Sequence, residues 1–315
     1  MDRVLTLELV RVTERAAMAA ASMRGRGNEQ RAHEAAVEAM WGELNRLDIR
    51  GRIVVGDAGS GGTQKLHVGE EIGTGDGPEV DIALDPLDGH TLCAKNMPNS
   101  ISVIAVTRRG GLLNAPDVYM EKIAVGPGYA PGTVSLDMEP EEAVARLAEA
   151  KQVRPQDISA CILDRPRHAA LIEKVRATGA SIRLIGDGDV SGIIHTTEPG
   201  TTGIDIYLGS GGAPEGVLAA AALRCIGGQM CGRLILDSDE KRRRADEHGI
   251  TDRGRVYSAS DMASGEVLFA ATGITDGSLL PGVWFDRDSV TTFSIATRSK
   301  TGTQRWVRAK HRRQA

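Results

Sequence analysis

Apolar positions recur along the chain with two different periods, and together they predict a mixture of helices and strands. Between residues 4 and 23 an apolar side chain returns every three or four positions, which predicts an amphipathic helix ending before Gly25. A similar pattern predicts a second helix from about 31 to 47. Short apolar runs predict strands at 52–56, 80–84, 101–107 and about 120–125.

Beyond residue 140 helices and strands are predicted to alternate, which is typical of an α/β architecture. The predicted helices are 140–150, 167–178, a short one from about 188, and 214–226. The predicted strands are 159–163, 181–185 and 204–208, followed by 266–271, 290–297 and 303–309 joined by turns. Because the regular alternation begins near residue 150, we expect an N-terminal α/β domain over 1–150 and a C-terminal α/β domain over 151–315.

Composition narrows the class of protein. A chain of 315 residues can form one large or two medium domains, and with only 3% aromatic residues their cores must be built from aliphatic side chains. A net charge of −4 argues against a dedicated nucleic-acid binder, so we expect the basic stretches 241–244 and 305–313 to be solvated. Four scattered cysteines predict free thiols in a reducing compartment, so the expected location is the cytoplasm. No apolar run approaches the length of about 18 residues that a membrane span needs.

The sequence Asp-Pro-Leu-Asp-Gly over 85–89 closes one of the predicted strands. Proline fixes a turn and glycine lets the backbone approach a ligand, so Asp85, Asp88 and the carbonyl of Leu87 could converge on one hard cation. Mg²⁺ prefers such oxygen ligands. The alternative is an ordinary surface turn, because Asp, Pro and Gly are common turn residues.

Three further segments follow predicted strands and favour a metal-assisted phosphate site. The segment 211–217 opens a helix whose N-terminus suits a phosphate and whose Glu215 could bind a metal. The segment 185–190 again combines acidic residues with glycines, and 164–168 offers two arginines that could pair with phosphate. In open α/β sheets ligands gather at the carboxyl ends of strands, so we expect these segments to meet.

The order of these segments resembles the class II fructose-1,6-bisphosphatases, including the dual fructose/sedoheptulose enzymes of photosynthetic bacteria. The matching segments span nearly the whole chain: ELVRVTERAA (8–17), GRG (25–27), VDIALDPLDG (80–89), NAPDVYMEK (114–122), DRPRH (164–168), GDGDV (186–190), GGAPEGVLAAAALRCIGGQM (211–230), VLFAATGITDG (267–277) and RSKTGT (298–303). That family belongs to the lithium-sensitive, metal-dependent sugar phosphatase superfamily. The resemblance implies a layered αβαβα fold, a phosphorylated sugar as substrate, Mg²⁺ or Mn²⁺ as cofactor, and a homo-oligomer, either dimer or tetramer.

The resemblance also implies a site. By position Asp85, Asp88 and Glu215 match the family's metal carboxylates, with Asp88 standing where Glu is usual. The positions that hold the sugar bisphosphate are mostly intact: Asp88, Gly89, Tyr119, Arg165, Pro166, Arg167, Asp187, Gly188, Asp189 and Gly212.

Departures from the family pattern cluster on the catalytic side. After the first helix the family reads G-[RK]-G-[DE]-[KR]-x-x-A-D, whereas this chain reads GRGNEQRAH, so His33 replaces an Asp that supports metal and water. Glu29 stands where a basic residue is usual, and of the acids in the family's next loop only Asp57 remains. The resemblance then leaves four carboxylates as metal ligands, which would still hold one Mg²⁺ or Mn²⁺: Asp57, Asp85, Asp88 and Glu215. His90 replaces a Thr or Ser whose hydroxyl helps to position the attacking water. Histidine is a poorer ligand for Mg²⁺ than for Mn²⁺ or Zn²⁺, so His33 would shift the metal preference if it coordinates.

Three functions are compatible with this sequence. In the first, the chain is a divergent metal-dependent sugar phosphatase with Asp57, Asp85, His33 and His90 as its catalytic residues, where His90 orients or deprotonates the attacking water. In the second, His33, His90 and Asp57 move protons on a sugar phosphate, as in an isomerase, an epimerase or a phosphate-eliminating lyase. In the third, the protein binds a sugar phosphate without catalysis. The intact substrate segments favour retained activity.

Overall fold

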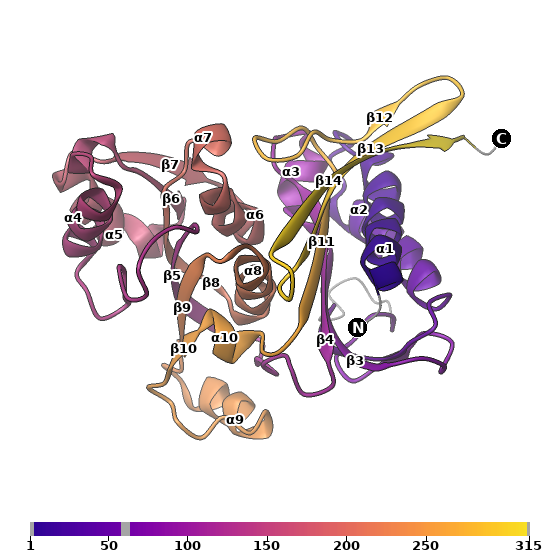
Figure 1. The fold of residues 1–315 in the computed structure, drawn as a ribbon, viewed down its shortest axis with the longest axis horizontal. Helices are drawn as coiled ribbons and strands as arrows, with labels where there is room; N and C mark the ends of the chain where they lie inside the picture. The colour runs from indigo at the N-terminus through magenta and orange to yellow at the C-terminus, as the bar shows by residue number, and fades with distance from the viewer. Residues whose placement is uncertain (1–2, 58–63, 314–315) are drawn as a thin grey trace.

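The computed structural model describes residues 3–57 and 64–313. The glycine-rich loop expected over 57–64 lies outside this part, apart from its two ends. Figure 1 shows two β-sheets stacked face to face, with one layer of helices between them and a further layer on the outer face of each sheet. The α/β class and the layered αβαβα arrangement predicted from the sequence are confirmed.

The first sheet has eight strands in the described part of the chain, in the order β12-β13-β11-β4-β3-β1-β2 with β14 on β13. Its strands are β1 (Arg50–Val55), β2 (Glu71–Ile72), β3 (Glu79–Asp88), β4 (Ile101–Arg108), β11 (Val267–Gly273), β12 (Trp284–Phe285), β13 (Ser289–Arg298) and β14 (Thr303–Arg312). β3, β4 and β11 are almost wholly buried, since helices cover both faces of the sheet at this point.

The second sheet has six strands among the described residues, in the order β10-β9-β5-β8-β6-β7. They are β5 (Tyr119–Val125), β6 (Ser159–Leu163), β7 (Ser181–Ile185), β8 (Ile206–Gly212), β9 (Gln229–Leu234) and β10 (Val256–Ser258). β6 pairs in parallel with both β7 and β8, so the carboxyl ends of these three strands lie at the same edge of the sheet. The segments expected to bind phosphate follow these strand ends.

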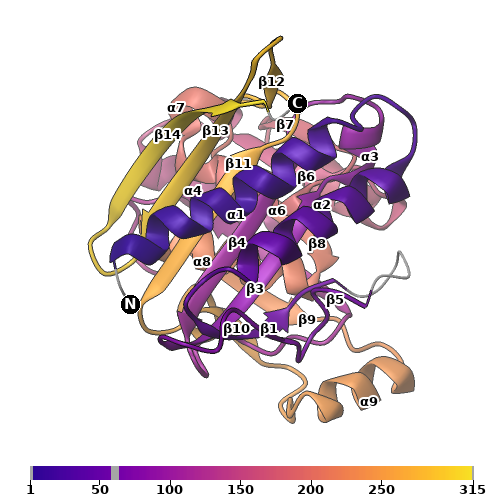
Figure 2. The same cartoon turned by 90° about the vertical axis from the view of Figure 1, so that its right-hand side faces the viewer.

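Helices form the other layers. They are α1 (Arg3–Ala21), α2 (Glu29–Leu44), α3 (His90–Ala94), α4 (Pro140–Lys151), α5 (Ala169–Ala177), α6 (Asp189–Ile194), α7 (Pro199–Thr202), α8 (Ala213–Ile226), α9 (Asp239–Glu247) and α10 (Ala259–Met262), with 3₁₀ turns at Pro155–Asp157, Pro166–His168 and His195–Thr197. α1 crosses β4, β11 and β13, with α2 beside it (Figure 2). α6 and α8 lie between the sheets, and α4 and α5 cover the far face of the second sheet (Figure 1).

The long predicted elements are present, with shifted ends. α1 and α2 account for the two amphipathic patterns, and Asn28 caps α2 by accepting a hydrogen bond from the Arg31 amide at 2.9 Å. The prediction missed several short elements and one longer one: β2, α3, α7, β9, β10, α9, α10 and β12. β8 was expected to end at residue 208 but continues to Gly212, because its glycines pair with β5.

The acidic segment was expected to be a turn, and this is wrong. β3 continues through Asp85 and Asp88, and both pair with β4 on either side of a shift in register. The shift is a bulge, which re-aims side chains at the end of a strand. The turn comes only at Gly89, whose φ of +83° is left-handed.

The sheets do not divide the chain at residue 150. β5, which precedes that residue, lies in the second sheet, and β11 to β14, which follow it, lie in the first. The predicted domain boundary therefore remains a proposal, and any unit built on the first sheet draws on both ends of the chain.

Three remaining expectations concern the thiols, the basic stretches and membrane-spanning helices. All four cysteines are free. The basic stretch 241–244 lies on α9, where each of its cations pairs with a nearby carboxylate, as expected of solvated charge. In the part of the chain that the structure describes, every helix is too short or too polar to cross a bilayer.

Candidate active site

The end of β3 presents two carboxylates to the second sheet, of which Asp88 is buried and Asp85 is half-buried. Oδ1 of Asp85 accepts a hydrogen bond from the Leu87 amide at 2.9 Å. Oδ2 of Asp88 accepts a hydrogen bond from the Ser191 amide at 3.1 Å, so Asp88 links β3 of the first sheet to α6, which lies between the sheets. On α3, just beyond the Gly89 turn, the Thr91 amide donates to Oδ2 of Asp187 at 3.1 Å. The acidic strand end and the segment after β7 are thus brought together, as expected.

A third carboxylate, on the half-buried side chain of Glu215, comes from the start of α8. Gly212 ends β8 opposite Tyr119 and caps the helix, which places Glu215 in its first turn. Oε2 of Glu215 is buried and has no hydrogen-bond partner among the described residues. Burial, together with the charge of Asp189, raises the pKa of Glu215 to about 7.

Negative charge accumulates around these three side chains. Burial raises the pKa of Asp85, and burial together with the charge of Asp85 raises the pKa of Asp88 well above its ordinary value. Asp187 and Asp189 add to the effect on Asp88. Asp189 is paired with the buried ammonium of Lys122, whose Nζ lies 2.5 Å from its Oδ2. Asp85, Asp88 and Glu215 have no ion-pair partner of this kind in the described part of the chain.

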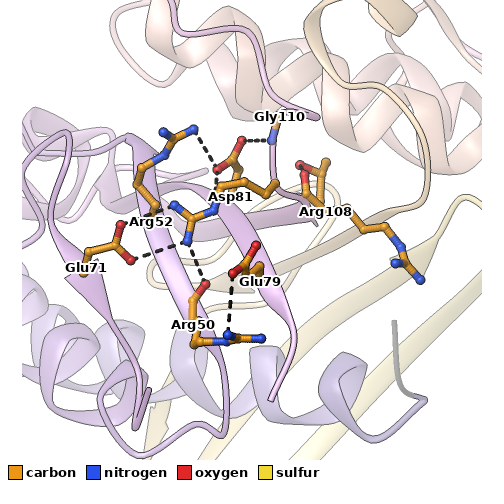
Figure 3. A network of polar contacts seen from close by, with 9 residues as sticks. Arg50, Arg52, Glu71, Glu79, Asp81, Arg108 and Gly110 are labelled. Atoms are coloured by element: carbon orange, nitrogen blue, oxygen red, sulfur yellow. Dashed lines mark hydrogen bonds and ion pairs between the residues drawn. The ribbon is translucent and has the colours of Figure 1, made fainter. Parts of the chain in front are cut away.

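The start of β3 shows the contrasting arrangement. Oδ1 of Asp81 accepts a hydrogen bond from Arg52 at 3.1 Å, and Oδ2 accepts one from the Gly110 amide at 2.6 Å (Figure 3). The guanidinium of Arg109 lies 3.7 Å from Oδ1 as well. Asp81 is therefore neutralised by the fold, whereas the carboxylates at the other end of the same strand are not.

Two histidines and Asp57 form a hydrogen-bonded chain beside the carboxylates. Nε2 of His33 lies 3.1 Å from Oδ2 of Asp57, and Nδ1 of His33 lies 2.9 Å from Nε2 of His90. Burial opposes the charging of His33, but the hydrogen bond and charge of Asp57 prevail and raise its pKa above the ordinary value. The sequence suggested that both histidines belong to the site, but it did not indicate that they touch.

Five residues of the predicted site line one cavity of about 790 Å³: His33, Asp57, Asp85, His90 and Glu215. A second cavity, of about 690 Å³, contains Tyr119 and Arg167 together with His168 and Ser210. The guanidinium carbon of Arg167 lies 4.6 Å from the centre of the Tyr119 ring. The acidic and the cationic parts of the predicted site therefore lie in separate cavities.

The remaining predicted residues are more dispersed. Asp187 and Gly188 line a third cavity, of about 180 Å³. Arg165 precedes the 3₁₀ turn that begins with Pro166, and its Nη1 donates to the carbonyl of Asp164 at 3.1 Å. The geometry gives Arg167 a clearer opportunity to bind phosphate than Arg165.

Sequence reasoning missed two residues that organise the site, Lys122 and Ser210. A signal existed for Lys122, because strand alternation puts it on the same buried face as Met120 and Ala124, where an ammonium requires a partner. Ser210 gave no signal, since it lies in a glycine-rich stretch that was not expected to be a strand.

The donor set fits a hard divalent cation in its chemistry. Asp85, Asp88 and Glu215 are oxygen ligands, and their raised pKa values and the unpartnered Oε2 of Glu215 are what a missing positive charge would produce. As the described side chains stand, no three His, Cys, Asp or Glu residues are grouped closely enough to hold an ion. His33 and Asp57, the other suggested ligands, bind each other instead.

Comparison with known proteins assigns the chain to a family. Residues 3–311 match the family described as bacterial fructose-1,6-bisphosphatase, glpX-encoded. A protein of Synechococcus sp. (strain JA-3-3Ab), named D-fructose 1,6-bisphosphatase class 2/sedoheptulose 1,7-bisphosphatase, is 42% identical over 99% of this chain and 96% of its own length. A protein of the same name from Prochlorococcus marinus (strain NATL1A) is 40% identical over 99% and 97%.

Among solved structures, the extragenic suppressor protein suhB from Bartonella henselae covers 62% of this chain and 74% of its own, with 15% identity and a TM-score of 0.35. A likeness this distant supports no conclusion. The family match and the two relatives rest on nearly the full length of the chain. The chain therefore belongs to the family of glpX-encoded bacterial fructose-1,6-bisphosphatases.

Proposed function

We propose that this protein is a cation-dependent sugar phosphatase that hydrolyses a phosphate ester of a phosphorylated sugar, with a catalytic centre altered by His33 and His90. The observation that carries the proposal is the group of buried and half-buried carboxylates, Asp88, Asp85 and Glu215, that form no ion pair with a cation in the described structure. Buried charges in proteins are paired or bind metals. The names of the relatives support a sugar bisphosphate as the substrate class.

Each part of the site has a role in this proposal. Asp85, Asp88 and Glu215 would hold Mg²⁺ or Mn²⁺, which supplies positive charge against the phosphate when bound. The first turn of α8 points its free amides toward the same region. Arg167, stacked on Tyr119, would bind a phosphate in the second cavity. His90 stands beside Asp85 in the first cavity, where it can orient the attacking water.

A second candidate is favoured by the Asp57–His33–His90 chain. A carboxylate that orients one imidazole, which in turn bonds a second, resembles the arrangement used to move protons. In that case the reaction would be an isomerisation, an epimerisation or an elimination on a sugar phosphate. Binding without catalysis is the third outcome.

One assay separates these functions. The protein is offered a panel of sugar mono- and bisphosphates with EDTA, Mg²⁺ or Mn²⁺, and both free phosphate and product masses are measured. Phosphate released only with a divalent cation supports the proposal. A changed product without phosphate release supports the second candidate, and a ligand-induced thermal shift without any product supports binding alone.

A variant tests the cation site directly. Asp85→Asn keeps an oxygen that can accept from the Leu87 amide but removes the charge, so it should lose Mn²⁺ binding measured by calorimetry and keep its fold. The matched control is Asp76→Asn, an exposed position that should retain Mn²⁺ binding. Unchanged affinity in Asp85→Asn would contradict the assignment.

Two further proposals come from the sequence. The four free thiols support a place in the reducing cytoplasm. We retain a homo-oligomer, dimer or tetramer, as the assembly to be tested by light scattering.

A further inference from the structure

His168 is a buried histidine in the second cavity, and both of its ring nitrogens have partners. Nδ1 lies 2.7 Å from the carbonyl oxygen of Leu163 at the end of β6. A carbonyl can only accept, so Nδ1 carries the proton and Nε2 of the neutral ring is an acceptor. The Ser210 amide donates to Nε2 at 2.9 Å. The ring is therefore fixed between two strands of the second sheet.

The surroundings keep the ring neutral. Burial lowers the pKa of His168, and the charges of Arg167 and Arg165 lower it further, against the opposing effect of the Leu163 carbonyl. Protonation would place a hydrogen on Nε2 and turn it toward the Ser210 amide, which is itself a donor. The direction of each hydrogen bond is thus set by the fold.

Ser210 connects His168 to Arg167. Its Oγ lies 3.0 Å from Nε2 of His168 and accepts a hydrogen bond from Nε of Arg167, also at 3.0 Å. The Ser210 carbonyl accepts from Nη2 of Arg167 at 2.7 Å. The edge of the guanidinium formed by Nε and Nη2 is therefore held by one residue, while its face lies on the Tyr119 ring. Among the described residues Nη1 has no partner, which leaves it for an anion.

Gly209 provides the space for this arrangement. A Cβ added at this position would lie 3.2 Å from Cε1 and 3.4 Å from Nε2 of His168, and the residue has a φ of +147°. The backbone conformation favours glycine, and a Cβ at this position would crowd the ring. The strand is thus shaped around the imidazole, which argues against His168 being an incidental core residue.

We propose that His168 is a positioning residue: it fixes Ser210 and, through Ser210, orients the guanidinium of Arg167 for a phosphate group in the second cavity. The inference rests on the proposed function, because it takes a sugar phosphate to be the ligand. It adds a residue that does not touch the substrate yet sets how tightly the substrate's phosphate is held. A preorganised arginine loses less freedom on binding than one that must be ordered by its ligand.

Two substitutions separate positioning from packing. Asn at position 168 can still donate to the Leu163 carbonyl but does not reach Ser210, whereas Gln places an acceptor near the position of Nε2. With D-fructose 6-phosphate and inorganic phosphate as probes in calorimetry, His168→Asn should weaken binding about tenfold, the scale of one lost hydrogen bond to an arginine network. His168→Gln should stay within about threefold of wild type. The control His311→Asn, on β14, should bind normally.

A double-mutant cycle tests whether the effect passes through Arg167. Arg167→Ala should itself weaken binding by about ten- to a hundredfold, the range for a charge-assisted hydrogen bond. In the Arg167→Ala background His168→Asn should then have no further effect. In steady-state kinetics His168→Asn should raise KM with little change in kcat. The inference would be overturned if the losses of binding free energy in His168→Asn and Arg167→Ala were additive in the double variant. Equal losses in His168→Asn and His168→Gln would also overturn it.

The outcome is distinguishable from failure of the proposed function. If the predicted binding pattern appears but no sugar phosphate releases phosphate, the proposed function fails and the positioning role stands. If phosphate is released but the two losses add, only the positioning role fails. If the wild type binds neither probe, both are wrong.

Discussion

Nε2 of His33 lies 3.1 Å from Oδ2 of Asp57, and both side chains are buried. Burial alone would lower the pKa of His33, but the hydrogen bond and charge of Asp57 raise it above the ordinary value of about 6.5. A histidine pKa raised on folding contributes stability that is fully present below the unfolded value and is lost as pH rises through the folded value. The His33–Asp57 contact should therefore stabilise the protein more at pH 6 than at pH 9.

The prediction is checked by urea unfolding of wild type and His33→Gln at these two pH values. The difference in unfolding free energy between wild type and His33→Gln should be larger at pH 6 than at pH 9. Asp57→Asn removes the partner charge and serves as the control, because burial then lowers the pKa of His33 and the gap between Asp57→Asn and Asp57→Asn/His33→Gln should no longer be larger at pH 6 than at pH 9. A gap for wild type that is equal at both pH values would contradict the role of Asp57.

Glu215 should destabilise the cation-free protein at neutral pH. Its pKa rises from 4.5 to about 7 on folding, so between these values the unfolded chain is ionised while the folded chain keeps its proton. Stability is then lost as pH rises through this window and is not regained above it. In EDTA at pH 8, Glu215→Gln should be more stable than wild type by on the order of 2 kcal/mol, and at pH 4.5 the difference should vanish.

Adding Mn²⁺ should reverse this ranking, because the cation stabilises the ionised carboxylate that the variant lacks. Thermal melts of both proteins at pH 8, with EDTA and with Mn²⁺, provide the measurement. If wild type gains no more than Glu215→Gln from Mn²⁺, Glu215 is not a ligand.

Asp81 should matter for stability and not for catalysis. It lies four residues before Asp85 on β3, about 13 Å along the strand, and is enclosed by Arg52, Arg109 and the Gly110 amide. Asp81→Ala leaves these donors without an acceptor and should cost about 2–3 kcal/mol, less than a fully buried pair because Arg52 is partly exposed. The exposed pair Arg50–Glu79 in the same network is the control, and Glu79→Ala should cost less than about 1 kcal/mol. Equal losses in urea unfolding would contradict the distinction.

Much of the fold could be predicted because its long elements carry clear periodic patterns. α1, α2, α8 and the buried strands of both sheets are long enough for apolar spacing to identify them. β9 and α9 were missed because β9 contains glycine and polar residues and α9 is almost wholly charged, so neither shows an apolar pattern. The return of β11 to β14 to the first sheet could not be predicted, because strand order depends on packing between distant segments.

The residues of the site could be predicted better than its geometry. Asp85, Glu215 and Arg167 stood out because they follow the predicted ends of strands, and the structure puts each of them on a cavity wall. The contact of His33 with His90 joins residues 57 positions apart, and no local pattern encodes it. Lys122 shows the opposite case, since its place on an apolar strand face was visible in the sequence.

The last prediction concerns His90, which replaces a small hydroxyl residue expected at this position. Its Nε2 is tied to His33, and the ring centroids lie 4.6 Å apart, so the side chain belongs to a hydrogen-bonded chain ending at Asp57. When His33 is neutral its Nδ1 accepts from His90, and when His33 is protonated its Nδ1 donates instead, so the proton state of His33 sets the direction of the bond. If this chain transfers a proton during turnover, the wild-type rate should change between about pH 6 and 8.5, and His90→Thr should lower kcat by about 100-fold, the usual scale of general acid–base catalysis.

Full pH–rate profiles of wild type and His90→Thr on the same sugar phosphate, at saturating Mn²⁺, decide the matter. The matched control is His67→Gln, because His67 lines the same cavity but, in the described part of the chain, its ring contacts near neighbours in sequence, the Gln64 carbonyl and the Glu70 carboxylate. This variant should keep both the rate and the pH limb. A flat wild-type profile, or a His90→Thr variant as active as wild type or more so, would show that His90 merely occupies the space of the hydroxyl residue and that the water is activated elsewhere. A lower rate in His90→Thr that keeps the wild-type pH limb would instead assign the limb to another group, and His90 would then be limited to orienting the water.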